Sequence, residues 1–530
     1  MIGSSQSGNL GTILFIVFVA GTLVITAYAA RKASTASGFF AAGRRMSAVK
    51  NGFAINGDYM SASSFLGIAG LVALFGFDGL TYSFGFIVGW LVILLLVAEP
   101  LRNIGKYTLA DVMDFRLGSA SLRSVAAVST LVTVLFYLLA QLVAVDTITR
   151  LLLPINPSVA LAGVGALMIV YVLVGGMVSI TYIQIVKAFL LLTVTTALTI
   201  ALVSRFGFNL SSLLGAAAER SGDGSAFLEP GLYFTKPIDL ISLGLALALG
   251  AAGLPHVMAR FYTVPTARAA RTSALWVIGP LAGYMLMTTV LGFGAAAVVG
   301  GTEIGGASQS GNSATPLLAL RLAGGADTVW GNVVLAVICA IVFATIIAVV
   351  AGLTIAGATT IAHDLFSKVI FKGAVDEQRD VRIARIATLA LGTIAIVLAF
   401  AVKSLNVAFL ASLAFTVGAS ANLPVILYSL FWKRFNKIGA IAAIVVGIVS
   451  TLTLVAIGPS VIGVKGLFLH DVDPIFPLSN PGIITIPLGF LAGWLGSVIT
   501  RPSAQSGERF RELRLRELSG YGAEPSTASH

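Results

Sequence analysis

The sequence predicts an all-α integral membrane protein, from its composition and from two interrupted apolar segments. Hydrophobic residues make up 57% of the 530 residues and charged residues only 10%, whereas an ordinary soluble domain carries about 25% charged residues. Two long apolar runs are broken by polar residues, glycine or proline, at Asn56-Gly57-Asp58 and from Gly250 to Pro255-His256. The expected fold class is therefore a bundle of membrane-spanning helices, two of which are broken.

Apolar runs long enough to cross about 30 Å of hydrocarbon recur along the whole chain. We expect thirteen spans, at residues 10–30, 52–75, 80–98, 125–148, 159–178, 183–203, 240–259, 275–299, 332–362, 383–402, 407–431, 439–457 and 483–499. With the N-terminus outside, about three quarters of the 33 lysines and arginines fall on the inner side, as the positive-inside rule requires. We therefore expect a multi-pass plasma-membrane protein whose C-terminus is cytoplasmic.

The second to eleventh spans can form two inverted five-helix halves, each of which opens with a broken helix. The expected parts are an extracellular N-terminus (1–9), an extra helix (10–30), a first repeat (51–206), a second repeat (239–431), two C-terminal helices (438–500) and a cytoplasmic tail (501–530). In the tail, the run RFRELRLRELSG spaces its charges as on a helix that lies along an anionic membrane face. A solvated tail is the alternative.

Several function classes are excluded. The net charge of +11 does not indicate a nucleic-acid partner, because the basic residues mark short loops instead of one patch with interleaved aromatic residues. We find no phosphate-binding loop and no nucleophile elbow, and no His or Cys pair has metal-ligand spacing. We therefore expect neither an enzyme nor a cofactor. Breaks at matching places in two halves indicate the binding site of a secondary transporter.

Seven long motifs then follow one another from the second span to the start of the twelfth. They are GDYMSASSFLGIAG, GFDGLTYSFGFIVGW, RNIGKYTLADVMDFRLG, YVLVGGMVSITYIQIVKA, GLPHVMARFYTVPTARAARTS, AVVAGLTIAGATTIAHDLF and AFTVGASANLPVILYSLFWKRFNKIGA. In this order they resemble the sodium/solute symporter family, and more closely its acetate and monocarboxylate permease branch. The resemblance implies a leucine-transporter-like core of ten helices, with one extra helix before it and two after it. It also implies alternating access and uptake of acetate, propionate or pyruvate together with a coupling cation.

The expected substrate contacts are Tyr59, Gln141, Gly253, His256, Thr416 and Ser420. At a helix break, half-helix N-termini offer free N–H groups and a positive dipole end to a carboxylate, and Gly253 lets the backbone approach a ligand closely. His256 is either a substrate or gating contact or a satisfied core histidine. Gln141 faces the substrate according to the resemblance, or makes an interhelical hydrogen bond. For Thr416 and Ser420 the alternative to a place near the substrate path is helix packing.

The expected cation-coupling residues are Gly57, Asp58, Met60, Thr345 and Thr354. In the better-known sodium-driven relatives, one cation lies between carbonyls of the first core helix and two adjacent hydroxyl residues of the eighth. Here those two positions fall on Ala348 and Val349, whose side chains cannot bind sodium. Thr345 and Thr354 leave a rearranged sodium site open.

The absence of hydroxyls at Ala348 and Val349 favours a proton over sodium as the coupling ion. Asp58 is then the expected titratable group inside the membrane. The alternative role of Asp58 is to cap the second half-helix. Two further functions stay open: a sodium-coupled carrier of another small solute in the same fold, and a solute sensor derived from it.

Two arginines are expected to form ion pairs. Arg150 lies one helical turn after Asp146, which predicts an ordinary surface pair. Arg260 is expected to pair with an acidic residue of the inner gate. The candidates are Asp111, Asp114 and Asp364.

Overall fold

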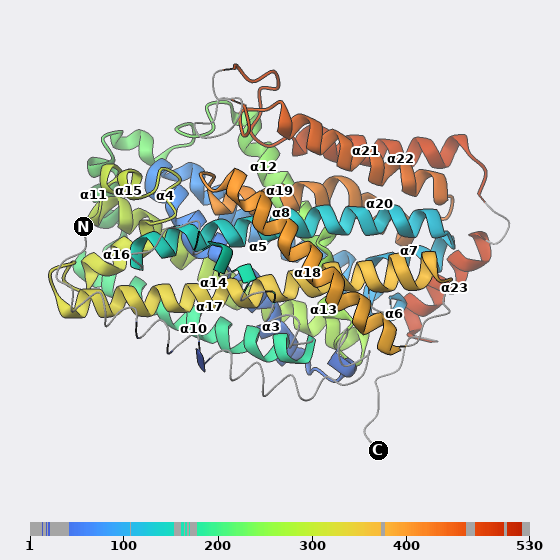
Figure 1. Cartoon of the computed structure of the whole chain (residues 1–530). Coiled ribbons are helices and arrows are strands. Elements are labelled where there is room, and N and C mark those ends of the chain that lie inside the picture. The colour runs from blue at the N-terminus through green and yellow to red at the C-terminus, as the bar shows by residue number, and fades with distance from the viewer. Residues whose placement is uncertain are drawn as a thin grey trace.

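The computed structural model describes residues 42–105, 108–152, 177–372, 377–462, 472–502 and 506–521, together with isolated positions in 13–21 and 159–169. Every regular element in these ranges is a helix, as Figure 1 shows, so the expected all-α class is confirmed. The expected spans at 10–30 and 159–178 lie almost wholly outside the described residues. The total of thirteen spans therefore stays a prediction.

Within the described residues, nine helices are long and apolar enough to cross a membrane, and two bent pairs raise the number to as many as eleven. Each of these eleven matches one expected span. The unbent spans are α5 (Phe77–Leu96), α8 (Ala120–Leu152), α10 (Met177–Arg205), α14 (Ala267–Val298), α17 (Val329–Thr359) continued by η5 (Thr360–Ile370), α18 (Glu377–Val402), α19 (Val407–Val417) continued by η6 (Gly418–Asn422) and α20 (Leu423–Phe431), α21 (Lys437–Ala456) and α22 (Gly482–Ile499).

Two spans bend near the predicted breaks. In the first, α3 (Ala48–Tyr59) meets the continuous pair η2 (Ser63–Ile68) and α4 (Ala69–Phe75) at 50°. In the second, α12 (Pro237–Gly250) with η4 (Ala251–Gly253) meets α13 (Pro255–Phe261) at 43°. The second break lies where the sequence predicts it, because Leu254 is extended and Pro255 starts a new helix.

The first break lies later than predicted. Gly57 and Asp58 belong to the last turns of α3, and the chain leaves the helix at Met60 (φ −71°, ψ 78°). Gly57 is helical, and a Cβ at this position would overlap the carbonyl oxygen of Gln184 on the neighbouring helix. The glycine therefore allows close helix packing and does not interrupt the helix. At the start of the second half-helix, the N–H of Ser61 donates to Ser64 Oγ at 3.0 Å and not to Asp58. Asp58 is therefore not the cap of the second half-helix.

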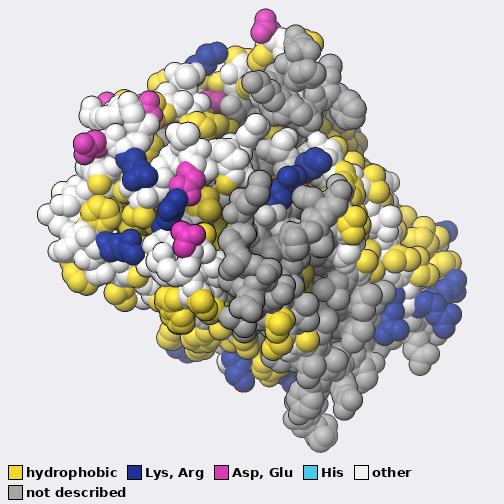
Figure 2. Space-filling model, turned by 60° about the vertical axis from the view of Figure 1, so that its left-hand side comes forward, with side chains coloured by type: hydrophobic (Ala, Val, Ile, Leu, Met, Phe, Trp, Pro, Cys, Tyr) yellow, Lys and Arg dark blue, Asp and Glu magenta, His cyan; other side chains and the backbone are white. Residues whose placement is uncertain are grey.

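The helices form one bundle in which the two bent spans lie between α5, α8, α10, α14, α17 and α19 (Figure 1). The C-terminal helices α21 and α22 pack as a pair on the outside of the bundle, against η6. Short helices that the sequence analysis did not predict are α6 (Ala98–Ile104), α7 (Leu109–Leu117), α11 (Leu210–Ser221), α15 (Gly301–Ala307) and α16 (Ala314–Leu322), with the 3₁₀ turns η1 (Ala42–Arg44) and η3 (Gly224–Leu228). On the face in Figure 2, wide hydrophobic areas separate small groups of charged side chains.

The tail forms the helix α23 (Ser506–Ser519), which packs against α6 and α7. Leu513 is buried in this contact, and the Asn103 side chain donates to the carbonyl of Glu517 at 2.9 Å. The described part of the tail is therefore a helix docked on the bundle and not a solvated tail. Leu515 and Leu518 stay exposed on this helix, and its expected place along an anionic membrane face stays a prediction.

Candidate functional site

A buried ion pair joins the two bent spans. Arg260 of α13 donates from Nε to Asp58 Oδ2 at 2.7 Å and from Nη2 to Asp58 Oδ1 at 3.2 Å. Asp58 is 3% exposed and Arg260 is 1% exposed. The fork of the guanidinium matches the carboxylate, which is the strong geometry for such a pair. The prediction that Arg260 binds an inner-gate acid is wrong, because the bend brings its side chain to α3.

Two further helices complete the surroundings of this pair. Gln184 of α10 donates from Nε2 to Asp58 Oδ1 at 2.7 Å and to the carbonyl of Ala348 on α17 at 3.0 Å. Thr181 Oγ1 accepts from Arg260 Nη1 at 2.9 Å. Asp58 thus fixes the relative positions of four helices, α3, α10, α13 and α17.

Lys187 is the unexpected member of this site. It lies one turn after Gln184 on α10, is 3% exposed, and its Nζ has no hydrogen-bond partner among the described residues. It lies within electrostatic range of Asp58 and Arg260. We call Asp58, Thr181, Gln184, Lys187 and Arg260 the Asp58 cluster. When Lys187 is protonated the cluster holds two positive charges and one negative charge, so it favours the arrival of an anion.

Aromatic rings connect the two breaks. Tyr59, the last residue of α3, lies 5.1 Å from the Trp90 ring and 6.2 Å from the Phe415 ring between centroids. Phe415 lies 6.3 Å from Tyr137, and Tyr137 stacks on His256 at 5.2 Å. The chain of rings therefore runs from the first break, across α19 and α8, to the second break.

Several polar atoms along this chain of rings are buried and have no hydrogen-bond partner in the part of the chain that the structure describes. They are Tyr59 Oη, Trp90 Nε1, Gln141 Oε1 and His256 Nδ1. A buried polar atom that lacks a partner costs about 1–3 kcal/mol, and such atoms call for an explanation such as a ligand. Gln141 also donates to Ser63 Oγ at 2.8 Å, which is the interhelical bond that was its alternative role.

The remaining predicted substrate residues lie in packed contacts. A Cβ on Gly253 would overlap the carbonyl oxygen of Gly418, and the Gly253 carbonyl accepts from Asn422 at 2.8 Å. Thr416 Oγ1 accepts from Asn480 at 2.9 Å, and Ser420 Oγ lies 2.7 Å from Thr485 Oγ1. Both hydroxyls therefore bind α22 or the segment before it, and we leave them out of the site.

The two threonines of α17 do not form one cation site. They are nine residues apart, which places them on opposite sides of a helix with about 3.6 residues per turn. Thr354 lines a small apolar cavity between α8 and α18, beside Leu138 and Ile396. Thr345 shares a helix face with Ala348 and Gly352, whose Cβ position lies 3.5 Å from Asp58 Oδ1. Thr345 Oγ1 is buried and has no partner among the described residues. Met60, a predicted coupling residue, is buried at the end of α3.

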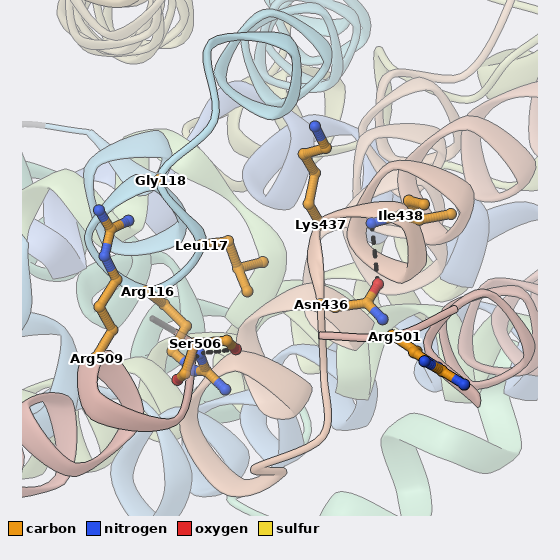
Figure 3. Close-up of a pocket in the computed structure, with 9 residues that line it drawn as sticks. All are labelled: Arg116, Leu117, Gly118, Asn436, Lys437, Ile438, Arg501, Ser506 and Arg509. Atoms are coloured by element: carbon orange, nitrogen blue, oxygen red, sulfur yellow. Dashed lines mark hydrogen bonds between the residues drawn. The ribbon is translucent and has the colours of Figure 1, made fainter. Parts of the chain in front are cut away.

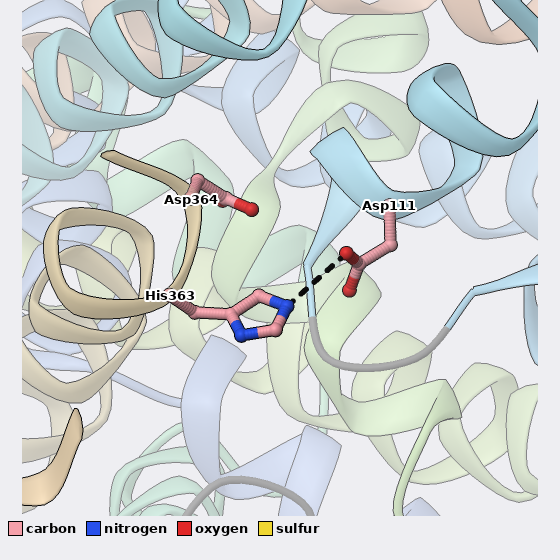
Figure 4. Close-up of side chains that lie close together, drawn as sticks. All are labelled: Asp111, His363 and Asp364. Carbon is pink, nitrogen blue, oxygen red and sulfur yellow. Dashed lines mark hydrogen bonds and ion pairs between the residues drawn. The ribbon is translucent and has the colours of Figure 1, made fainter. Parts of the chain in front are cut away.

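A second charged cluster lies on α7, the start of α8 and η5. Arg123 Nη1 donates to Asp364 Oδ1 at 2.6 Å and to Asp111 Oδ1 at 2.9 Å, and Nη2 donates to Asp114 Oδ2 at 2.8 Å. His363 Nε2 lies 3.3 Å from Asp111 Oδ1, as Figure 4 shows. Possible metal ligands on Asp111, His363 and Asp364 lie within 4.8 Å of one another. Arg123 already binds one oxygen of Asp111 and one oxygen of Asp364 and supplies the positive charge between them, so these residues fit an ion-pair cluster centred on arginine, which we call the Arg123 lock.

Sequence reasoning missed Thr181, Gln184 and Lys187 as a group, although Gln184 and Lys187 stand in the matched run YIQIVKA. Their spacing of three residues on an apolar helix was the available signal, because it puts all three on one face. The expected pair of Asp146 and Arg150 is confirmed, with 2.7 Å between Oδ2 and Nε.

Comparisons with known proteins give matches over nearly the whole chain. Residues 39–447 match the family model described as the sodium:solute symporter family. A protein of Bacillus subtilis (strain 168) described as the uncharacterized symporter YwcA is 46% identical over 515 residues, which cover 97% of this chain and 98% of the relative. The monocarboxylic acid transporter of Corynebacterium glutamicum is 44% identical over 542 residues, which cover 98% of this chain and 97% of the relative.

Among solved structures, a Na⁺-coupled sialic acid symporter in a substrate-bound, outward-open state superposes with a TM-score of 0.71. The two sequences are 15% identical, and the match covers 93% of this chain and 99% of that one. This likeness concerns the fold alone.

Proposed function

This chain belongs to the sodium:solute symporter family, and from that premise we propose that it brings small monocarboxylates such as acetate, propionate or pyruvate into the cell with a cation, a proton being favoured over sodium. The observation that carries the proposal is Lys187, a buried amine that has no hydrogen-bond partner among the described residues and lies within electrostatic range of the ion pair of Asp58 and Arg260. The substrate class is supported by the 44% identity to a protein named monocarboxylic acid transporter.

The chemistry of the two breaks suits a small carboxylate. Tyr59 Oη, Trp90 Nε1 and His256 Nδ1 are buried atoms without partners that can each donate a hydrogen bond. Aromatic rings surround them, so the methyl group of acetate or pyruvate has apolar contacts. In this proposal these three residues and the half-helix end at Pro255 receive the substrate.

Lys187 makes a proton the favoured coupling ion. Its side chain can carry a proton within electrostatic range of Asp58 and Arg260, and on α17 this chain has Ala348 and Val349 where sodium-driven relatives carry hydroxyls. A sodium ion near Asp58 would be repelled by Arg260, and also by Lys187 when that residue is protonated.

Coupling then follows from charge balance. A carboxylate that binds in the site raises the affinity of Lys187 for a proton. By linkage, a proton on Lys187 raises the affinity of the site for the carboxylate by the same factor. Proton and substrate bind best together, and the empty site returns with Lys187 neutral. Asp58 stays paired with Arg260 throughout and orients the guanidinium.

The test is uptake of labelled pyruvate into proteoliposomes, at fixed membrane potential, under an imposed inward proton gradient or an imposed inward sodium gradient. We expect concentrative uptake with the proton gradient in the absence of sodium. Uptake only with sodium would overturn the proton assignment and keep the symporter. Uptake with neither gradient would overturn the substrate class.

A sodium-coupled carrier is the second candidate, and one observation favours it. Thr345 Oγ1 is buried without a partner on the face of α17 that points toward the Asp58 cluster. Thr345→Val separates the two candidates, because it removes one possible sodium ligand and nothing that the proton mechanism uses. Unchanged proton-driven uptake by this variant supports the first candidate, and loss of a sodium-driven uptake supports the second.

A further inference from the structure

A basic pocket lies where the tail helix meets the bundle, away from the Asp58 cluster. Its volume is about 340 Å³. It is lined by Arg116, Leu117, Gly118, Asn436, Lys437, Ile438, Arg501, Ser506 and Arg509 (Figure 3). These residues come from the end of α7, the start of α21, the end of the last span and the start of α23. Four of them are cationic, and none is acidic.

Arg116 forms the floor of this pocket. Its side chain is fully buried, which is rare for an arginine that has no acidic partner. Nη1 donates to the carbonyl and to Oγ of Ser506, at 2.8 Å each, and Nη2 donates to the carbonyl of Lys433 at 2.9 Å. Nε is buried and has no partner among the described residues. All of the observed acceptors are neutral, so the positive charge of Arg116 is not compensated.

Arg509 adds a second positive charge at close range. It reaches from α23 to Gly118, where a Cβ would overlap its Nη1 (Figure 3). Gly118 has φ +57°, a left-handed backbone conformation that favours glycine. Burial, and after it the charge of Arg509, lower the pKa of Arg116 to about 10. The fold thus holds two like charges together, which costs free energy unless an anion lies between them.

We propose that this pocket is a binding site for a phosphate group, supplied either by free phosphate or by an anionic lipid headgroup of the cytoplasmic leaflet. A phosphate group accepts several charge-assisted hydrogen bonds, for which arginine is the preferred donor. Arg116 Nε, Arg509, Arg501 and Lys437 are the donors, and no acidic residue of the pocket lining opposes them. Binding there also holds α23 against α7.

The experiment uses the full-length protein, purified in detergent and freed of lipid, in phosphate-free buffer. The melting temperature is measured against increasing inorganic phosphate and, separately, short-chain phosphatidylglycerol, with short-chain phosphatidylcholine as the zwitterionic reference. We expect a rise in melting temperature that saturates, because a ligand that binds the folded state stabilises it by mass action. Arg509→Gln and Arg501→Gln should each weaken the apparent affinity about tenfold.

The matched control is Arg511→Gln, which removes the same charge from the exposed side of the same helix. It should leave the apparent affinity unchanged. Without phosphate, Arg509→Gln should raise the melting temperature, because it removes the like charge beside Arg116. A rise with inorganic phosphate supports a free-phosphate site, and a rise with phosphatidylglycerol alone supports a lipid site. No rise with either ligand, or an equal loss in Arg511→Gln, would overturn the proposal.

Discussion

At the residue scale, the ion pair of Asp58 and Arg260 occupies both charged groups and leaves Lys187 outside the pair. Both groups are nearly fully buried, and both oxygens of the carboxylate accept hydrogen bonds from the guanidinium. A buried pair adds little net stability relative to an apolar replacement, but removal of one partner leaves an uncompensated charge. In the proposed mechanism Asp58 is therefore a positioning residue, and Lys187 is the group that carries the proton.

Asp58→Asn should lower the free energy of unfolding by about 3–5 kcal/mol, because it strands the charge of Arg260. The measurement is the melting temperature in detergent. Asp58→Asn combined with Arg260→Gln should recover much of the loss, since the stranded charge of Arg260 is then removed as well. A single variant as stable as the parent would contradict the buried pair.

Lys187→Met should abolish accumulation of pyruvate under a proton gradient while the protein stays folded, because it replaces an unpaired buried ammonium by an apolar chain of similar length. Exchange of internal for external pyruvate without a gradient should persist. The readout is therefore the ratio of gradient-driven uptake to exchange. Normal gradient-driven uptake by this variant would remove Lys187 from the proton path.

At the scale of the elements, the two bent spans depend on glycines that bring backbones together. Gly57 meets the carbonyl of Gln184 on α10, Gly250 meets that of Phe415, and Gly253 meets that of Gly418. Each carbonyl lies where a Cβ would be. These contacts explain why the bends stay in place although each bend leaves backbone groups outside regular helix pairing.

Gly253→Ala should destabilise the protein by about 1–3 kcal/mol through overpacking, and should reduce uptake because η6 is pushed away from the second break. The matched control is Gly283→Ala in α14, where no atom lies within 4 Å of the Cβ position. That exchange should be neutral or slightly stabilising. Melting temperature and uptake of both variants test this, and equal effects would refute the packing role of Gly253.

At the scale of the whole molecule, the Asp58 cluster and the Arg123 lock tie together helices that are distant in sequence. Arg123 bonds acids on α7 and on η5, and Thr108 donates to Asp364 Oδ1 at 3.0 Å. The alternating access that the family resemblance implies would require some of these contacts to open. The Arg123 lock is then a candidate, because it joins α7, α8 and η5 through side chains alone.

Arg123→Gln should lower the melting temperature, because Asp111, Asp114 and Asp364 lose their common partner. The cost is largest for Asp111 and Asp364, whose carboxylates lie in surroundings of low dielectric constant. Arg150→Gln, at the other end of α8, removes a half-exposed pair and should change stability by less than about 1 kcal/mol. If both variants melt alike, the lock does not hold these elements together.

The sequence by itself determined the membrane class, the positions of eleven helices and the break before Pro255, because each depends on a local property: apolar length, or the conformational limits of proline. It placed the first break too early, because Gly57 serves helix packing. Its long motifs also indicated the family. Thr345 and Thr354 could have been separated by helix geometry alone.

Only the tertiary structure decided which side chains contact one another across helices. It placed Arg260 on Asp58 and not on the inner acids, turned Thr416 and Ser420 toward α22, and left Lys187 buried without a hydrogen-bond partner beside the pair. The physical reason is that a bend of 43–50° redirects every side chain beyond it. Which charges meet across helices depends on those directions, and no spacing within one helix records them.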